Sequence, residues 1–264
     1  MNLKIFWSFI RQAFQYVSAY RFNFFVEIFL TFVRMYSIYW VWRILYTQKP
    51  GAFGVNMQQM ITYGVLGVAM QIFMWSRVQW YIANQVKSGA IDTDLMKPLD
   101  FHVHMLARST GETIIGSILA LPALIVSFIF LDVSLPVNPA AAVAFFISIV
   151  LGFMVIFHLN FILGMLAVFT LDIRHISWAY MSITRFFGGQ WVPLWLFPPA
   201  LVVIANLLPF QSTFAIPMSI YIGKIAGADI FRALGTQFSW MVALALGSRI
   251  LWTWAHRRLV VQGG

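Results

Sequence analysis

The stretch AAAVAFFISIVLGFMVIFHLNFILGMLAVFTL, residues 140–171, decides the fold. It contains no Asp, Glu, Lys or Arg. It is also longer than the roughly 20 apolar residues that a helix needs to cross a lipid bilayer. A charge-free run of this length predicts a transmembrane helix, with residues to spare for tilt or for extension beyond the bilayer.

The composition of the whole chain points the same way. Of its 264 residues, 61% are hydrophobic and only 9% are charged, whereas a soluble domain carries about 25% charged residues. The mean hydropathy is +0.82. Because a soluble protein of this size has too little interior to bury so many apolar side chains, the composition excludes a soluble enzyme, a disordered chain and a nucleic-acid-binding module. It predicts an all-α integral membrane protein.

Working outward from residues 140–171, we expect six transmembrane helices in one domain that covers residues 1–264. The predicted spans are residues 22–46, 58–82, 110–131, 140–171, 176 to about 197, and 233–255. Before the first span, residues 1–21 place polar and apolar side chains on opposite helical faces, which predicts an amphipathic helix in the membrane interface. The alternative is a simple extension of the first span.

Glycines and prolines interrupt the apolar pattern between residues 188 and 224. Irregular backbone at membrane depth persists only where protein or a wet cavity satisfies its polar groups. We therefore expect re-entrant half-helices on the outer side after the fifth span, forming an outer gate. Gly188, Gly189 and Pro193 are the candidate kink positions there.

The distribution of charge sets the expected topology. The net charge is +9, but the basic residues are scattered between apolar runs, which argues against nucleic acid as a partner. The predicted cytoplasmic segments carry nine Lys and Arg residues, and the predicted outer segments carry three. This imbalance places both termini in the cytoplasm. A seven-span alternative, with residues 199–216 as a span, would put Arg257 and Arg258 outside and needs a proline-rich helix.

The sequence offers little catalytic chemistry. The absence of cysteine excludes disulfides and thiolate metal sites, and neither a P-loop nor a catalytic Ser or zinc motif occurs. We expect no cofactor, no metal and no catalytic residue. His102 and His104 form only a weak metal pair, and a solvated surface is the favoured interpretation. For His158 and Asn160, within the fourth span, we expect hydrogen bonds between helices.

Charges inside spans require partners because the bilayer penalises them. Glu27 and Arg34 lie seven residues apart in the first span, so they share a helix face. That face is expected to look inward, toward a translocation pathway, a subunit interface or a structural ion pair. The sequence gives no partner for Arg185 in the fifth span.

The segment 83–108 is the most polar part of the chain and is longer than a turn between two spans requires. Asp92 or Thr93 is suited to cap a short helix there, and Pro98 to end it. A compact amphipathic element of this kind suits docking into a groove on a soluble partner. The alternative is a solvated loop.

Four stretches of this chain, taken in order, resemble the ABC-2-type permeases, specifically the transport-system permease components. They are GAIDTDLMKPLD (residues 89–100), GQWVPLWLFP (189–198), LPF (208–210) with Pro217, and RRLVVQGG (257–264). Each motif is loose, but their order and spacing on a six-span chain are fairly specific. The resemblance covers essentially the whole chain.

The resemblance implies the membrane subunit of an ATP-driven exporter in the plasma membrane, here a bacterial inner membrane. A second permease chain, identical or related, would pair with it, and two copies of a separate ATPase would drive it. The lack of a P-loop fits that division of labour. The implied contacts with the ATPase fall on the coupling residues Ser88, Gly89, Asp92, Asp94, Leu95, Lys97 and Pro98.

Other classes of function remain open at this stage. An ATP-independent carrier or channel would need no companion motor. An intramembrane enzyme acting on lipid would need a cluster of acidic or histidine side chains, for which Glu27, Glu112 and His158 are the candidates. An importer permease would need an outer docking surface, and the short loops at 47–57 and 132–139 leave little room for one. The substrate is not readable from the sequence.

Overall fold

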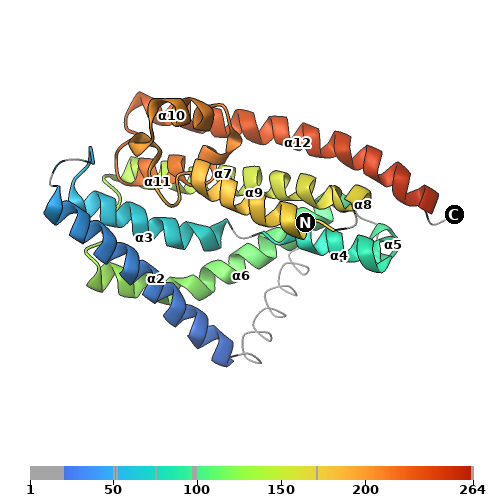
Figure 1. The fold of residues 1–264 in the computed structure, drawn as a ribbon, viewed down its shortest axis with the longest axis horizontal. Helices are drawn as coiled ribbons and strands as arrows, with labels where there is room; N and C mark the ends of the chain where they lie inside the picture. Colours follow the sequence, from blue (N-terminus) through green and yellow to red (C-terminus); the bar gives the residue numbers. More distant parts are fainter. Residues whose placement is uncertain are drawn as a thin grey trace.

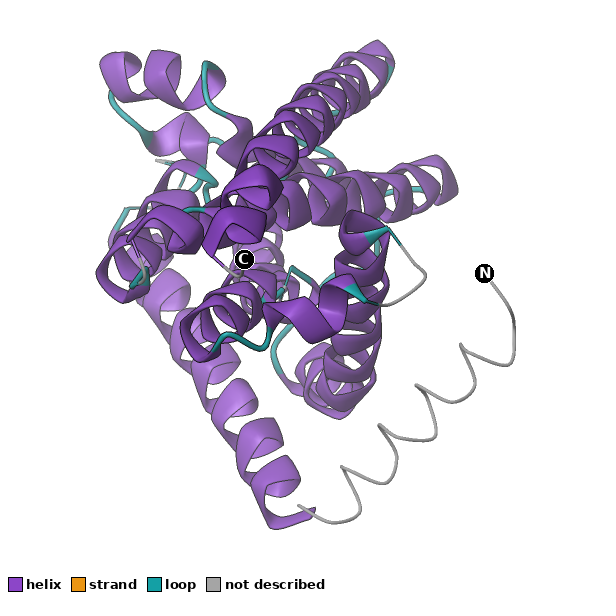
Figure 2. Ribbon diagram, turned by 90° about the vertical axis from the view of Figure 1, so that its right-hand side faces the viewer, coloured by secondary structure: helices purple, strands orange, loops and turns teal. Residues whose placement is uncertain are grey.

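The computed structural model describes residues 21–49, 51, 53–74, 76–96, 100–170 and 172–262, and every regular element among them is helical (Figures 1 and 2). The predicted interfacial helix at residues 1–21 lies outside this part of the chain except for its last residue, and so do Lys97 and Pro98. The helices are α2 (Arg21–Gln48), α3 (Met57–Phe73), α4 (Val78–Ser88), α5 (Ile91–Leu95), α6 (Phe101–Phe130), α7 (Pro139–Met165), α8 (Ala167–Thr170), α9 (Arg174–Phe187), α10 (Pro199–Asn206), α11 (Ala215–Tyr221) and α12 (Ala228–Gln262), with 3₁₀ turns η1 (Leu194–Leu196) and η2 (Pro209–Ser212).

Four helical segments in the described chain are long and apolar enough to cross a membrane. They are Phe25–Gln48 in α2, Phe101–Phe130 in α6, Pro139–Thr170 across α7 and α8, and Ala228–Arg257 in α12. Four of the six predicted spans therefore have a helix of sufficient length. The other two take a different form.

The predicted continuous second span, residues 58–82, is wrong. Helix α3 ends at Phe73, and α4 starts at Val78 after a break. The Nδ2 of Asn160 donates to the backbone carbonyl of Ser76 at 3.1 Å, so a partner on α7 satisfies backbone at the break. Val78 and Ile82 then bury against α7, alongside Phe157 and Phe161. Tertiary packing thus outweighs the continuous apolar pattern.

The predicted fifth span also ends early. Helix α9 has 14 residues, which is a length of about 21 Å, short of the roughly 30 Å hydrocarbon core. It stops at Phe187 because the chain turns at Gly188 and Gly189, where Gly189 takes a φ of +76°. This left-handed conformation is available to glycine at little cost.

Helix α7 lies at the centre of the bundle. It packs against α4, α11 and α12, and its side chains enter two separate apolar cores, one with α3 and α11 and the other with α4, α6 and α12. Helices α2, α3 and α6 form a further core around Met35, Trp42 and Ile61. The charge-free run at residues 140–171, most of which forms α7, is therefore the segment around which the other helices assemble.

The bundle has two distinct ends. Figure 1 shows α4, α5 and α8 at one end, near the C-terminus, and α10 and α11 at the opposite end. We call these the α5 end and the α11 end. Figure 2, turned by 90°, views the molecule from the α5 end and shows the long helices crossing one another instead of running parallel.

Replacing Gly188 with Ala is expected to lower stability by about 1–3 kcal/mol, because overpacking forces its neighbours apart. An added Cβ would lie 2.9 Å from the ring of Phe214 and 3.1 Å from the carbonyl oxygen of Phe210, and it would also clash with the carbonyl of Thr184. The measurement is the apparent melting temperature of the purified chain in detergent.

The matched control is Gly235→Ala in α12, where an added Cβ meets nothing within 4 Å. That change should hold or raise the melting temperature, since alanine favours a helix over glycine. Equal effects of the two substitutions would contradict the close packing at Gly188.

Candidate functional site

A partly enclosed cavity of about 60 Å³ lies at the break between α3 and α4. Four helices and the chain just before α11 contribute to its wall, so it sits inside the bundle and brings together distant parts of the sequence. Its lining residues are Gln71, Met74, Ser76, Gln79, Ile156, Asn160, Tyr180, Met181, Thr184, Arg185 and Phe214.

Local sequence explains how α4 reaches this position. Gly164 of α7 faces the start of α4, and a Cβ there would lie only 3.0 Å from the Cα of Gln79. The missing side chain lets the two backbones approach closely. This close approach and the hydrogen bond from Asn160 to the Ser76 carbonyl together place Gln79 in the cavity wall.

Helix α9 turns its polar side chains inward. Ser177 and Thr184 are buried, whereas Trp178 and Ile183 on the same helix are 64% and 46% exposed. A soluble helix shows the reverse pattern. An inward polar face with an outward apolar one is what a helix between lipid and a polar interior requires, and it brings Tyr180, Thr184 and Arg185 to the cavity.

One buried oxygen on the cavity wall, Gln79 Oε1, has no hydrogen-bond partner within the described residues. The hydroxyls of Tyr180 and Thr184 are buried on the same wall and interact with each other. Buried polar atoms in native proteins almost always have a partner, in the protein or in ordered water. Because these residues line one cavity, the cavity is suited to a polar occupant.

Arg185 adds a positive charge to this wall. It is half-buried, and no carboxylate in the described chain forms an ion pair with it. The charge of Arg34 on α2 acts on it unfavourably. Arg34 and Glu27 are themselves exposed, so their face does not look into the bundle of the single chain, and its role at a pathway or subunit interface stays a prediction. Helix α2 buries Met35, Tyr39 and Trp42 instead.

A second polar cluster joins α6, α7 and α12. The rings of His102 and His158 stack at 5.1 Å, and each has a nitrogen 3.1 Å from Ser248 Oγ. The prediction of a hydrogen bond between helices is confirmed for His158, whereas Asn160 bonds the backbone of the break between α3 and α4. The interpretation of His102 as a solvated residue is wrong, since it is 6% exposed. Around these residues, no group of three or more His, Cys, Asp or Glu in the described chain is arranged to hold a metal.

The predicted coupling residues that the structure describes, Ser88, Gly89, Asp92, Asp94 and Leu95, lie in or next to α5, at the α5 end of the molecule. Gly89 ends α4 with a φ of +72°, and the N-cap of α5 is Ala90, without a side-chain cap. The expectation that Asp92 or Thr93 caps this helix is therefore wrong. Ser88 folds back on its own helix, donating to Asn84 O at 2.8 Å.

The two aspartates of α5 have opposite environments. Asp92 is exposed, whereas Asp94 is 2% exposed and accepts hydrogen bonds from the Tyr81 hydroxyl at 2.7 Å and from Gln85 Nε2 at 2.9 Å. Asp94 thus ties α5 to α4 and is not the surface contact that the sequence suggested. Leu95 is half-buried against the core of this end, and Met96 is 83% exposed.

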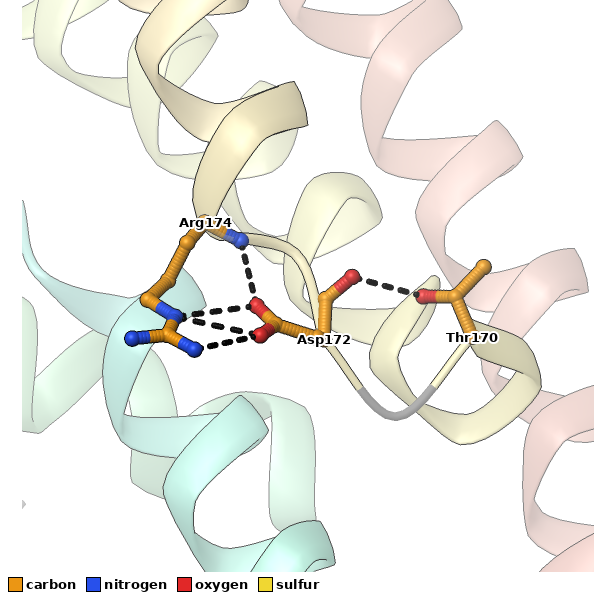
Figure 3. A network of polar contacts seen from close by, with 3 residues as sticks. All are labelled: Thr170, Asp172 and Arg174. Atoms are coloured by element: carbon orange, nitrogen blue, oxygen red, sulfur yellow. Dashed lines mark hydrogen bonds and ion pairs between the residues drawn. The ribbon is translucent and has the colours of Figure 1, made fainter.

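Another polar turn at the α5 end precedes α9 (Figure 3). Arg174 donates to Asp172 through its backbone N–H, at 2.8 Å, and through its guanidinium, with Nη2 at 2.9 Å from Oδ2. The Thr170 hydroxyl donates to the Asp172 carbonyl at 3.3 Å. The side-chain hydrogen bond from Arg174, followed by the backbone one, lowers the pKa of Asp172 to about 2.

The segment after α9 is fixed to α3. The Tyr63 hydroxyl donates to the Gly189 carbonyl at 2.8 Å, and Gln190 Nε2 donates to the Gly67 carbonyl at 3.0 Å. Pro193, which is buried, precedes η1. The glycine pair predicted as a kink is thus a buried packing point with backbone hydrogen bonds.

Sequence reasoning identified none of Gln79, Tyr180 and Thr184 as site residues. A usable signal was present, because Ser177, Tyr180 and Thr184 recur at helical spacing on one side of an otherwise apolar stretch. Gln79 carried no comparable signal, since its position depends on the break before α4.

These features define a helical membrane protein with a polar cavity inside an apolar bundle. The sequence model of the ABC-2 family transporter proteins matches residues 32–263. The chain belongs to this family, as the resemblance in its motifs indicated. Among curated proteins, no match to the chain is found.

Replacing Asp94 with Ala is expected to destabilise the protein by about 2–3 kcal/mol, since hydrogen bonds to a charged group are lost and buried partners are left unpaired. Tyr81 and Gln85 are those partners. Thermal unfolding of the purified chain checks this. Asp92→Ala, at an exposed site, is the control and should change stability by less than about 0.5 kcal/mol. Similar losses for both variants would contradict the assignment.

The carboxyl of Asp172 is expected to titrate near pH 2, below its usual 3.8. Because folding lowers this pKa, the ion pair with Arg174 is fully present above about pH 3.8 and is lost as the pH falls through about 2. Carbon NMR of labelled aspartate side chains measures the midpoint. Arg174→Gln should move it up toward 3.8, whereas Arg232→Gln should leave it unchanged. A midpoint near 4 in the unaltered chain would contradict the arrangement.

Proposed function

We propose that the chain is the permease subunit of an ATP-driven exporter, which forms the translocation pathway and is driven by a separate ATPase subunit. The observation that carries the proposal is the polar cavity. Inside the bundle of a transporter-family member, the polar side chains of Gln79, Tyr180, Thr184 and Arg185 line one cavity at a helix break. Broken helices that line a cavity recur at substrate sites of membrane transporters.

In this proposal the chain crosses the membrane six times. Helices α3 and α4 together make the second crossing, α9 and the packed segment after it make the fifth, and α2, α6, α7 with α8, and α12 make the others. Lys87 lies in the last turn of α4, Arg174 begins α9 after α8, and Arg257 lies near the end of α12. Because α4, α8 and the C-terminus lie at the α5 end, the positive-inside rule favours a cytoplasmic α5 end at the plasma membrane, with both termini on the same side.

The coupling surface is then the exposed part of α5 and its surroundings. Asp92 and Met96 are accessible to a partner, and Ser88, Gly89 and Leu95 shape the element that presents them. Lys97 and Pro98 belong to the same proposed contact by sequence. Two ATPase copies would each engage one permease, and a second permease, identical or related, would complete the pathway.

Export is the favoured direction because the α11 end offers little space for a binding protein to dock. The Trp195 indole donates to Phe53 O at 3.0 Å, and the Tyr221 hydroxyl donates to Ser134 O at 3.1 Å. These bonds hold the loops at this end against the half-helices. Gly188, Gly189 and Pro193 would form part of the outer gate, opening only when this packing is released.

The alternatives receive less support. A lipid-acting enzyme needs clustered acids or histidines, but Glu112 pairs with Arg108 at 3.1 Å, His158 bonds Ser248 and Glu27 is exposed. A carrier or channel that needs no ATP gives no role to the α5 surface. Transport by the purified chain alone would favour the carrier or channel.

Replacing Asp92 with Lys is expected to reduce recovery of the ATPase about tenfold, since reversing a charge in a contact costs on the order of 1.4 kcal/mol or more. The measurement is pulldown of the tagged chain from membranes, with the co-purified P-loop protein identified by mass spectrometry. Asp229→Lys, an exposed aspartate in the first turn of α12, is the control and should retain the ATPase. Recovery of an active transporter with no ATPase would overturn the proposal.

A further inference from the structure

The cavity contains chemistry that points to a particular class of ligand, and this inference rests on the proposed function. Arg185 places a guanidinium on the cavity wall inside the bundle without an ion-pair partner among the described residues. The positive charge of Arg34 on α2 acts on Arg185 unfavourably and does not neutralise it. Because a lone charge inside a bilayer is unfavourable, this wall favours a negatively charged occupant.

The start of α4 also makes the cavity favourable for a negatively charged ligand. Helix α4 has 11 residues and no side-chain cap at its N-terminus, and Ser76 and Gln79 from this turn line the cavity. The first N–H groups of a helix have no acceptor within the helix, and the helix dipole adds positive potential there. An uncapped helix start that faces a cavity is suited to receive an anionic oxygen.

The uncharged polar side chains of the cavity wall indicate that the ligand also has a hydrogen-bond donor. Gln79 and Thr184 are each 3% exposed, Gln79 Oε1 has no partner in the described chain, and the Thr184 hydroxyl interacts with that of Tyr180. An amide oxygen only accepts hydrogen bonds, whereas a hydroxyl both donates and accepts. A ligand that satisfies all of them carries anionic oxygens together with at least one hydroxyl donor.

The size of the cavity limits how much of the ligand enters. A volume of about 60 Å³ holds about four water molecules at roughly 15 Å³ each, which suits one compact polar group. Met74, Ile156 and Met181 supply apolar wall beside the polar groups. We propose that this cavity binds the phosphate-type, hydroxyl-bearing head group of an amphipathic substrate, with its apolar part along these side chains.

The test is equilibrium binding of radiolabelled lysophosphatidylglycerol to the full chain in phosphatidylcholine nanodiscs. Lysophosphatidylcholine, whose head group is zwitterionic and has no free hydroxyl of its own, should bind at least tenfold more weakly. Arg185→Gln should weaken binding of the anionic lipid at least tenfold. Thr184→Val should weaken it about threefold, and Thr184→Ser, which keeps the hydroxyl, should bind as the unaltered chain does.

The control variant is Arg232→Gln, which removes a guanidinium whose side chain is 84% exposed and should leave binding unchanged. Each variant is first checked for a single species in detergent, and the serine and valine pair at Thr184 separates binding from folding. Equal binding of the two lipids, or no loss in Arg185→Gln, would overturn the proposal. Full competition by inorganic phosphate at equal concentration would assign the site to a free anion and overturn its amphipathic part.

This experiment is independent of the ATPase. If head-group binding fails while the ATPase still co-purifies through Asp92, only the ligand assignment is lost. If the ATPase is absent while binding persists, the cavity assignment stands and the proposed function falls.

Discussion

Backbone groups inside an apolar bundle must find hydrogen bonds within the protein, since lipid offers none. Long helices meet that requirement internally. The backbone is not continuously helical at two places inside the bundle, the break between α3 and α4 and the segment that follows α9. In each case a side chain from a neighbouring helix satisfies the exposed backbone, Asn160 at Ser76 and Tyr63 at Gly189. The arrangement of the remaining elements depends on these two side-chain hydrogen bonds, which replace the bonds that a continuous helix would make.

The first departure places the cavity where it is. Because α4 starts anew at Val78 and packs on Gly164, Gln79 enters a space that α9 already lines with polar side chains. The same helix ends at the α5 end, where Tyr81 and Gln85 hold Asp94. A single short helix therefore connects the cavity wall to the surface that we propose for the ATPase.

The second departure makes the α11 end compact. The short helix α11 rests against α3 and α7, whereas α10 contacts the turns η1 and η2. Gln237 of α12 joins this end by donating to Ser212 O of η2 at 2.7 Å. Opening this end would expose several buried polar groups at once, for which a polar substrate or water can substitute. This packing is consistent with the outer gate that we propose for this end.

The sequence by itself determined that the chain is an all-helical membrane protein, that four apolar runs form helices long enough to cross a bilayer, and that its motifs belong to the ABC-2 family. These properties follow from composition and from contiguous residues, which act locally. It also predicted the hydrogen-bonding role of His158 and Asn160, because polar groups in a span have few other options. Only the tertiary structure decided where α4 begins, that Arg185 lines the cavity, and that Arg34 is exposed. It also decided that Asp94 and His102 are buried. Each depends on which neighbour a side chain meets, since an apolar pattern specifies burial in lipid and in protein equally well and does not distinguish the two.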